Sequence, residues 1–110
     1  MDLESYNQRL EQFATDRDWG QFHNPKNLAV ALSVEASELL EIFQWLTPQE
    51  AEQIMAGPRS KDVRDELADV QIYLLRLASV LNVDLEVEVD TKIRRNEERF
   101  PASGRPDTNL

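Results

Sequence analysis

Residues 60–81 carry the strongest structural signal of this 110-residue chain and read SKDVRDELADVQIYLLRLASVL. From Val70 to Leu81, apolar side chains cover nearly the whole circumference of a helix. A helix that is apolar all round has to be covered on every side. A chain this short builds too few helices for that. We therefore predict an all-α, four- to five-helix bundle that is completed by homo-oligomerisation.

Start and stop signals predict the other helices. Asn24 stands before Pro25, a capping residue followed by proline at the first helical position. Thr47 and Glu50 have the spacing of a capping box, and Gly57 begins the stop signal of that short helix. The expected helices span residues 2–15, 24–46, 47–57, 60–81 and 84–99.

Ser60 and Asp84 are the expected N-caps of the last two helices. Residues 83–89 alternate apolar and acidic side chains and are compatible with a strand, but they continue into strongly helical sequence, which favours a helix. The domain organisation follows. Residues 1–100 are predicted to form one helical domain, and residues 101–110 a flexible C-terminal tail.

Composition excludes several classes of function. Twelve Lys and Arg against twenty-one Asp and Glu give a net charge of −9, which disfavours nucleic-acid polymers and anionic membranes as partners. A small phosphorylated ligand remains possible if a cation bridges the like charges. The chain has no cysteine and one histidine, so thiolate zinc sites and thiol nucleophiles are excluded. We see neither a signal peptide nor a membrane span and expect a cytoplasmic protein.

Four carboxylates interrupt apolar stripes on two of the predicted helices. Glu35 and Glu38 share one face of the second helix, and Glu66 and Asp69 share one face of the fourth. If these faces meet, the acids need a counter-ion, and oxygen ligands select Mg²⁺, Mn²⁺ or Ca²⁺. Alternatively, the acids lie at the edge of the apolar face, solvated or paired with Lys and Arg. The pattern leaves both interpretations open.

Four motifs follow one another along the chain. They are DWGQFHNPKNL (18–28), VEASELLEIFQW (34–45), DELADVQIYL (65–74) and KIRRNEERFP (92–101). Through these motifs, residues 3–101 resemble the MazG-like all-α nucleoside triphosphate pyrophosphohydrolases, most closely their dCTP-pyrophosphatase branch. The resemblance implies Mg²⁺-dependent hydrolysis of a nucleoside triphosphate to monophosphate and pyrophosphate, with Mn²⁺ as a possible substitute. It also implies a dimer or tetramer with active sites at subunit interfaces.

The same resemblance implies the roles of individual side chains. The implied metal ligands are Glu35, Glu38, Glu66 and Asp69. Either of the first two also orients or deprotonates the attacking water. The implied substrate-binding residues are Trp19, His23 and Trp45 at the base, Tyr73 near the sugar, and Lys92 and Asn96 at the phosphates or sugar.

The resulting hypothesis is a house-cleaning enzyme of the nucleotide pool that acts on pyrimidine deoxynucleotides such as dCTP. Two alternatives remain. One is a hydrolase of the same fold that acts on dUTP or on damaged purine triphosphates. The other is a non-catalytic, acidic helical oligomerisation module, for which the four carboxylates would bind no metal.

Overall fold

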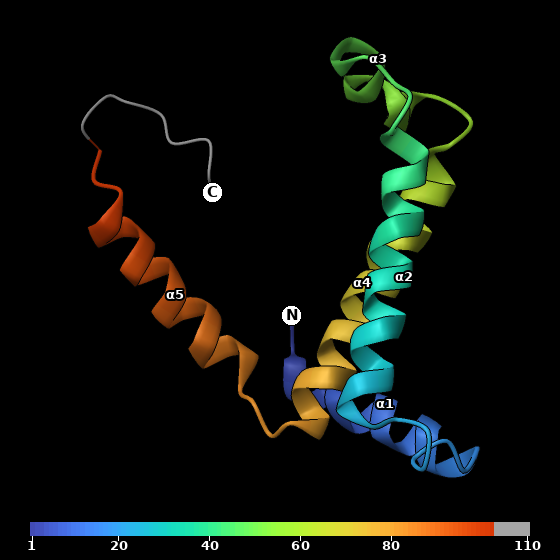
Figure 1. The fold of residues 1–110 in the computed structure, drawn as a ribbon, viewed down its shortest axis with the longest axis vertical. Coiled ribbons are helices and arrows are strands. Elements are labelled where there is room, and N and C mark those ends of the chain that lie inside the picture. Colours follow the sequence, from blue (N-terminus) through green and yellow to red (C-terminus); the bar gives the residue numbers. More distant parts are fainter. Residues whose placement is uncertain (103–110) are drawn as a thin grey trace.

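The computed structural model describes residues 1–102, which form an all-α arrangement without strands (Figure 1). Its elements are α1 (Leu3–Asp16), α2 (Pro25–Phe43), α3 (Pro48–Glu52), the 3₁₀ turn η1 (Ile54–Ala56), α4 (Ser60–Val80) and α5 (Leu85–Arg99). The predicted all-α fold class is confirmed, and residues 85–89 form the start of α5 rather than a strand. The predicted flexible tail lies, from residue 103 on, outside the described residues.

The antiparallel helices α2 and α4 form the centre of the molecule, and α1 packs against α4 near one end of this pair (Figure 1). The buried apolar core is small. Its members are Ala14, Leu28, Ile42, Val63, Leu75 and Ala78. Because α2 and α4 pack along their lengths, the face of each helix that carries the interrupted apolar stripe is turned towards the other.

Three of the predicted helix starts are built as expected. Oδ1 of Asn24 accepts a hydrogen bond from the Asn27 amide at 2.9 Å. Thr47 and Glu50 form the reciprocal capping box. Asp84 caps α5 through the Val87 amide, at 3.2 Å. Each bond satisfies an amide that a helix start would otherwise leave unpaired.

Three elements differ from the prediction. The short helix expected over residues 47–57 is divided into α3 and the 3₁₀ turn η1. The N-cap of α4 is Arg59 rather than Ser60, and it makes no side-chain capping bond. The Ser60 amide already donates to the Gly57 carbonyl at 3.3 Å, so the chain turns into the helix one residue earlier. α2 ends at Phe43 rather than at residue 46, and Thr47 has the extended backbone (ψ 161°) of the next N-cap.

Two left-handed residues end α1 and α4 in the same way. Asp18 (φ 55°) and Asn82 (φ 57°) are the non-glycine residues with positive φ among the described residues. Beyond the first, the Trp19 amide donates to the Ala14 carbonyl at 2.8 Å, and the equivalent bond after α4 joins Val83 and Ala78. This is the Schellman motif, and at α1 it folds the following loop back towards the helix that it leaves.

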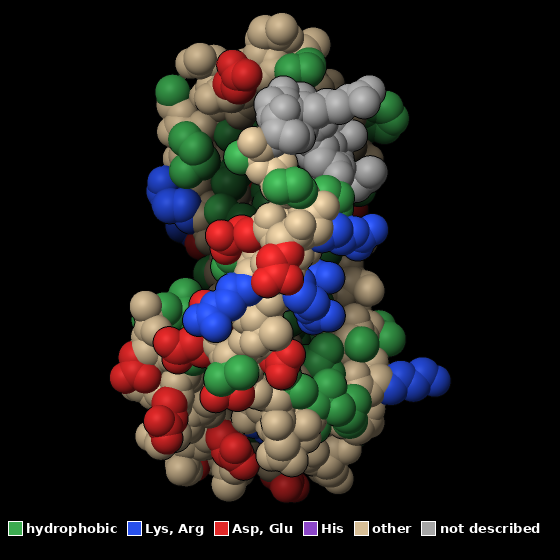
Figure 2. Space-filling view, turned by 90° about the vertical axis from the view of Figure 1, so that its left-hand side faces the viewer, with side chains coloured by type: hydrophobic (Ala, Val, Ile, Leu, Met, Phe, Trp, Pro, Cys, Tyr) green, Lys and Arg blue, Asp and Glu red, His purple; other side chains and the backbone are tan. Residues whose placement is uncertain are grey.

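Helix α5 lies apart from the other helices (Figure 1), and none of its residues is buried. The radius of gyration is 17.1 Å, whereas a compact chain of this length has about 13 Å. On α4, Leu67 and Ile72 remain 53% and 41% exposed. Figure 2 views the molecule from the side on which α5 lies and shows apolar side chains at the surface. One copy of residues 1–102 therefore covers α4 only in part, and completion by a second copy stays a prediction. No helix within this range has the length and hydropathy to cross a bilayer.

Candidate active site

Three carboxylates meet between α2 and α4. Glu35 and Glu38 stand one turn apart on α2, and Glu66 faces them from α4. Each offers one oxygen, and these oxygens all lie within 4.8 Å of one another. All three side chains are half-buried. The packing of the two helices therefore brings together three of the four carboxylates that interrupt the apolar stripes.

Within residues 1–102, no salt bridge reaches these three acids. Oε2 of Glu35 and Oε2 of Glu66 are buried and have no hydrogen-bond partner. Burial raises the pKa of Glu35 to about 7, helped by hydrogen bonds of its protonated form to Glu38 and Glu66 and by the charges of Glu38 and Asp69. Burial also raises the pKa of Glu66, again with the charges of Glu38 and Asp69. Two orphaned oxygens in an all-oxygen donor set fit a hard divalent cation such as Mg²⁺ or Mn²⁺.

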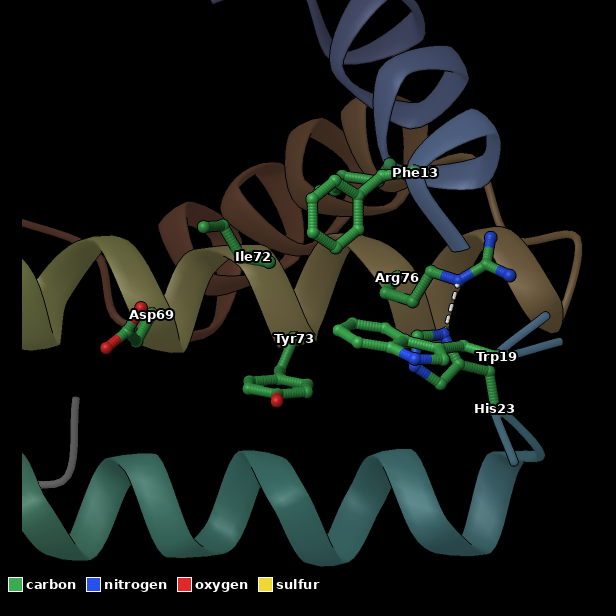
Figure 3. Close-up of a pocket in the computed structure, with 8 residues that line it drawn as sticks. Phe13, Trp19, His23, Asp69, Ile72, Tyr73 and Arg76 are labelled. Atoms are coloured by element: carbon green, nitrogen blue, oxygen red, sulfur yellow. Dashed lines mark hydrogen bonds between the residues drawn. The ribbon is translucent and has the colours of Figure 1, made fainter. Parts of the chain in front are cut away.

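Asp69 connects this cluster with a neighbouring pocket. It follows Glu66 by one turn of α4, and its charge contributes to the raised pKa of Glu35. It also lines a pocket of about 340 Å³ (Figure 3). A ligand seated in this pocket therefore has the carboxylates at its edge.

The pocket is bounded by α1, α4 and the loop between α1 and α2. Its lining residues are Leu10, Phe13, Trp19, His23, Asp69, Ile72, Tyr73 and Arg76 (Figure 3). Phe13 and Trp19 pack edge to face with ring centroids 5.3 Å apart, and Trp19 and His23 lie 6.0 Å apart. Flat aromatic walls of this kind suit a planar ligand.

The loop is held in place by its own backbone. After the left-handed Asp18, the Trp19 carbonyl accepts hydrogen bonds from the amides of Phe22 (2.8 Å) and His23 (3.1 Å). Nδ2 of Asn27 on α2 donates to the Phe22 carbonyl at 3.0 Å. The turn therefore presents Trp19 and His23 to the pocket, whereas the Phe22 side chain stays 59% exposed and does not line it.

Arg76 is the polar pocket residue that sequence analysis missed. It is only 8% exposed, and its Nε donates to Nδ1 of His23 at 3.0 Å. Its Nη1 lies 3.9 Å from a carboxylate oxygen of Glu11. Burial and, secondarily, the Arg76 charge lower the pKa of His23. A single arginine within the apolar run 70–81 was the available signal, because such a charge is rarely buried without a partner.

Three expected substrate-binding residues lie elsewhere in one chain. Trp45 follows the far end of α2, a helix of 19 residues and so about 28 Å long, and is 86% exposed. Lys92 and Asn96 line a separate hollow on α5. One chain therefore gathers Trp19, His23 and Tyr73 with the carboxylates. Trp45, Lys92 and Asn96 lie apart from them.

Known proteins resemble this chain in sequence and in fold. The sequence profile of the MazG-like family matches residues 30–108. dCTP pyrophosphatase 1 from Homo sapiens is 44% identical over 101 residues, and the enzyme of that name from Mus musculus is 41% identical over 100. The matches cover 91% and 90% of this chain, which spans only 59% of the length of each relative.

The fold has a solved counterpart as well. The crystal structure of a pyrophosphatase from Archaeoglobus fulgidus superimposes with a TM-score of 0.85 at 39% identity, over 92% of this chain and 94% of that one. Sequence profile and fold agree over most of the described residues. This chain belongs to the MazG-like family.

Proposed function

We propose that this protein is a Mg²⁺-dependent nucleoside triphosphate pyrophosphohydrolase that acts on pyrimidine deoxynucleotides such as dCTP. The observation that carries the proposal is the carboxylate cluster with two orphaned oxygens, which Asp69 joins to an aromatic pocket. The names of the relatives support the reaction and the base. A cytoplasmic, house-cleaning role belongs to the same proposal.

Glu35, Glu38, Glu66 and Asp69 would hold the metal, with Mn²⁺ as a possible substitute. Bound Mg²⁺ would neutralise the phosphates and lower the pKa of a water molecule. Glu35 or Glu38 accepts a hydrogen bond from the attacking water and orients it. The water oxygen bonds to the α-phosphorus and one of its protons passes to that glutamate. The bond from the α-phosphorus to the α–β bridging oxygen breaks, and pyrophosphate leaves with the electron pair of that bond.

The aromatic pocket supplies the base and sugar sites of this proposal. Trp19 offers a face on which a base stacks, and His23 lies beside it. Tyr73 stands one turn beyond Asp69 on α4 and so lies between the base site and the carboxylates (Figure 3). Its ring would disfavour a ribose 2′-hydroxyl and so select deoxynucleotides.

A second copy of the chain would complete the site. Trp45, Lys92 and Asn96 are remote from the pocket in one chain, and the apolar residues Leu67 and Ile72 remain exposed. A dimer or tetramer whose active sites lie at subunit interfaces accounts for both observations. Light scattering coupled to size-exclusion chromatography gives the subunit number directly.

The decisive assay is pyrophosphate release from canonical and modified nucleotides, with Mg²⁺ and with EDTA. Pyrophosphate from dCTP that EDTA abolishes supports the proposal. Preferential turnover of dUTP or of a damaged purine triphosphate would favour the first alternative. No turnover from a folded oligomer would favour the non-catalytic module.

Two variants tie the activity to the cluster. Glu38→Gln and Asp69→Asn remove one charge each with little change of shape. We expect turnover to fall about 100-fold or more, since even outer-shell changes at metal sites cost about 10- to 100-fold. Glu52→Gln, an exposed acid on α3, is the matched control and keeps full activity.

A further inference from the structure

We propose that Arg76 is a positioning residue that fixes His23 as a neutral ring protonated on Nε2. The pocket then presents one imidazole donor and selects a base whose facing edge carries an acceptor oxygen or nitrogen. This specificity role rests on the proposed function, since it treats the pocket as the base site. The state of the imidazole does not depend on that function.

The argument starts from what arginine can do. A guanidinium group carries only donors and keeps its charge at any pH at which the protein is folded. Nε of Arg76 lies 3.0 Å from Nδ1 of His23, so Nδ1 has to be the acceptor and carries no proton. In a neutral imidazole the proton is then on Nε2. The direction of this bond follows from the chemistry of the two groups.

The surroundings of the pair keep it in this state. Arg76 is 8% exposed and cannot turn into solvent without losing its packing on α4. From α1, Glu11 faces its Nη1 at 3.9 Å and partly balances its charge. Asp69, on α4, is the acid that lines the same pocket. Figure 3 shows Arg76 above His23, joined to it by the dashed hydrogen bond, with Tyr73 and Asp69 further along α4.

The remaining polar atom of the ring decides what the pocket accepts. With Nδ1 occupied, Nε2–H is the one group through which His23 addresses a ligand. A base edge with an acceptor gains a hydrogen bond, whereas an edge with an N–H donor leaves two donors facing each other. Without Arg76, the ring would sample both tautomers and its cation, and this selection would weaken.

The first test is spectroscopic and uses the whole 110-residue chain. The sequence contains one histidine, so the imidazole ¹⁵N signals need no assignment. We expect the wild type to show an unprotonated Nδ1 and a protonated Nε2, with a titration midpoint below 6.5. In Arg76→Met the midpoint should rise towards 6.5 and the tautomers mix, whereas Arg76→Lys should retain much of the wild-type pattern. Glu4→Gln, at an exposed acid in the first turn of α1, is the control and keeps the tautomer.

The second test is kinetic. Loss of one positioned hydrogen bond in Arg76→Met should raise KM for the pyrimidine substrate about tenfold and change kcat by less than about twofold. In a His23→Ala background, the same substitution should add less than about twofold. A purely structural arginine would give additive effects in this cycle.

The outcomes separate the two proposals. A wild-type imidazole that is protonated on Nδ1, or that titrates at 6.5 or above, overturns the role of Arg76 whatever the enzyme hydrolyses. Additive effects in the cycle overturn its role in specificity. Absence of any nucleotide turnover by the wild type contradicts the proposed function, and the ¹⁵N signals still decide whether Arg76 fixes the ring.

Discussion

Glu35 on α2 and Glu66 on α4 each hold one buried carboxylate oxygen that lacks a hydrogen-bond partner, and the two acids face each other across the central helix pair. Unpaired buried acceptors oppose the packing of the helices that carry them. The same packing forms the apolar core of the molecule. The stability of the fold is therefore coupled to the ionisation of this cluster.

The metal-free protein should lose stability as the pH rises from about 4.5 to about 7. The pKa of Glu35 is about 7 in the folded state and 4.5 as its ordinary value. Because the pKa of Glu35 is higher in the folded chain, the folded chain binds more protons than the unfolded chain in this window. Protonated Glu35 therefore stabilises the fold fully below pH 4.5, and this contribution is lost above pH 7. Melting temperatures in EDTA at a series of pH values measure the slope.

Two controls accompany this measurement. Mg²⁺ should raise the melting temperature most at pH 7 and above, where the cluster is ionised, because a ligand that binds only the folded state stabilises it. Glu66→Gln should flatten the pH slope in EDTA, since it removes one charge from the cluster. A melting temperature that rises with pH in EDTA would contradict the coupling.

The aromatic pocket gives a second prediction. Trp19→Ala should raise KM for the preferred nucleotide roughly 5- to 100-fold, because stacking of a base on an aromatic ring contributes about 1–3 kcal/mol. Phe22→Ala is the matched control, since Phe22 lies in the same loop but does not line the pocket. Equal changes in KM for both variants would show that the loop, rather than stacking on Trp19, determines affinity.

The sequence predicts most of the helices and part of the candidate site. Capping residues such as Asn24 and Asp84 predict helix starts well, because the bond that they make is local. Glu35 and Glu66 could be paired from their stripes, since two apolar faces pack together. Arg76 could not be placed, because its hydrogen bond to His23 spans 53 residues and depends on how a loop folds back. The separation of α5 from the other helices could not be predicted either. Its apolar residues predict burial but do not say which surface buries them.

The loop end of α1 offers a test of how Trp19 is positioned. Asp18 has φ 55°, a conformation that glycine adopts without steric cost. Asp18→Gly should therefore stabilise the fold by about 0.5–1 kcal/mol and leave KM unchanged. Asp18→Val should destabilise it and raise KM, because a β-branched residue disfavours this turn. Urea unfolding and substrate kinetics check both effects. If Asp18→Val changes neither the stability nor KM, the turn does not position Trp19.

The exposed side of α4 provides the test of self-association. Leu67 is 53% exposed in one chain, so Leu67→Lys should be nearly neutral for a monomer. If a second copy covers α4, the buried lysine charge instead disfavours association. We expect the variant to shift to smaller species in light scattering and to lose most turnover, because Trp45, Lys92 and Asn96 would no longer reach the pocket. Gln49→Lys, an exposed polar position on α3, is the control. A Leu67→Lys protein that keeps both its subunit number and its activity would exclude this face of α4 from the interface.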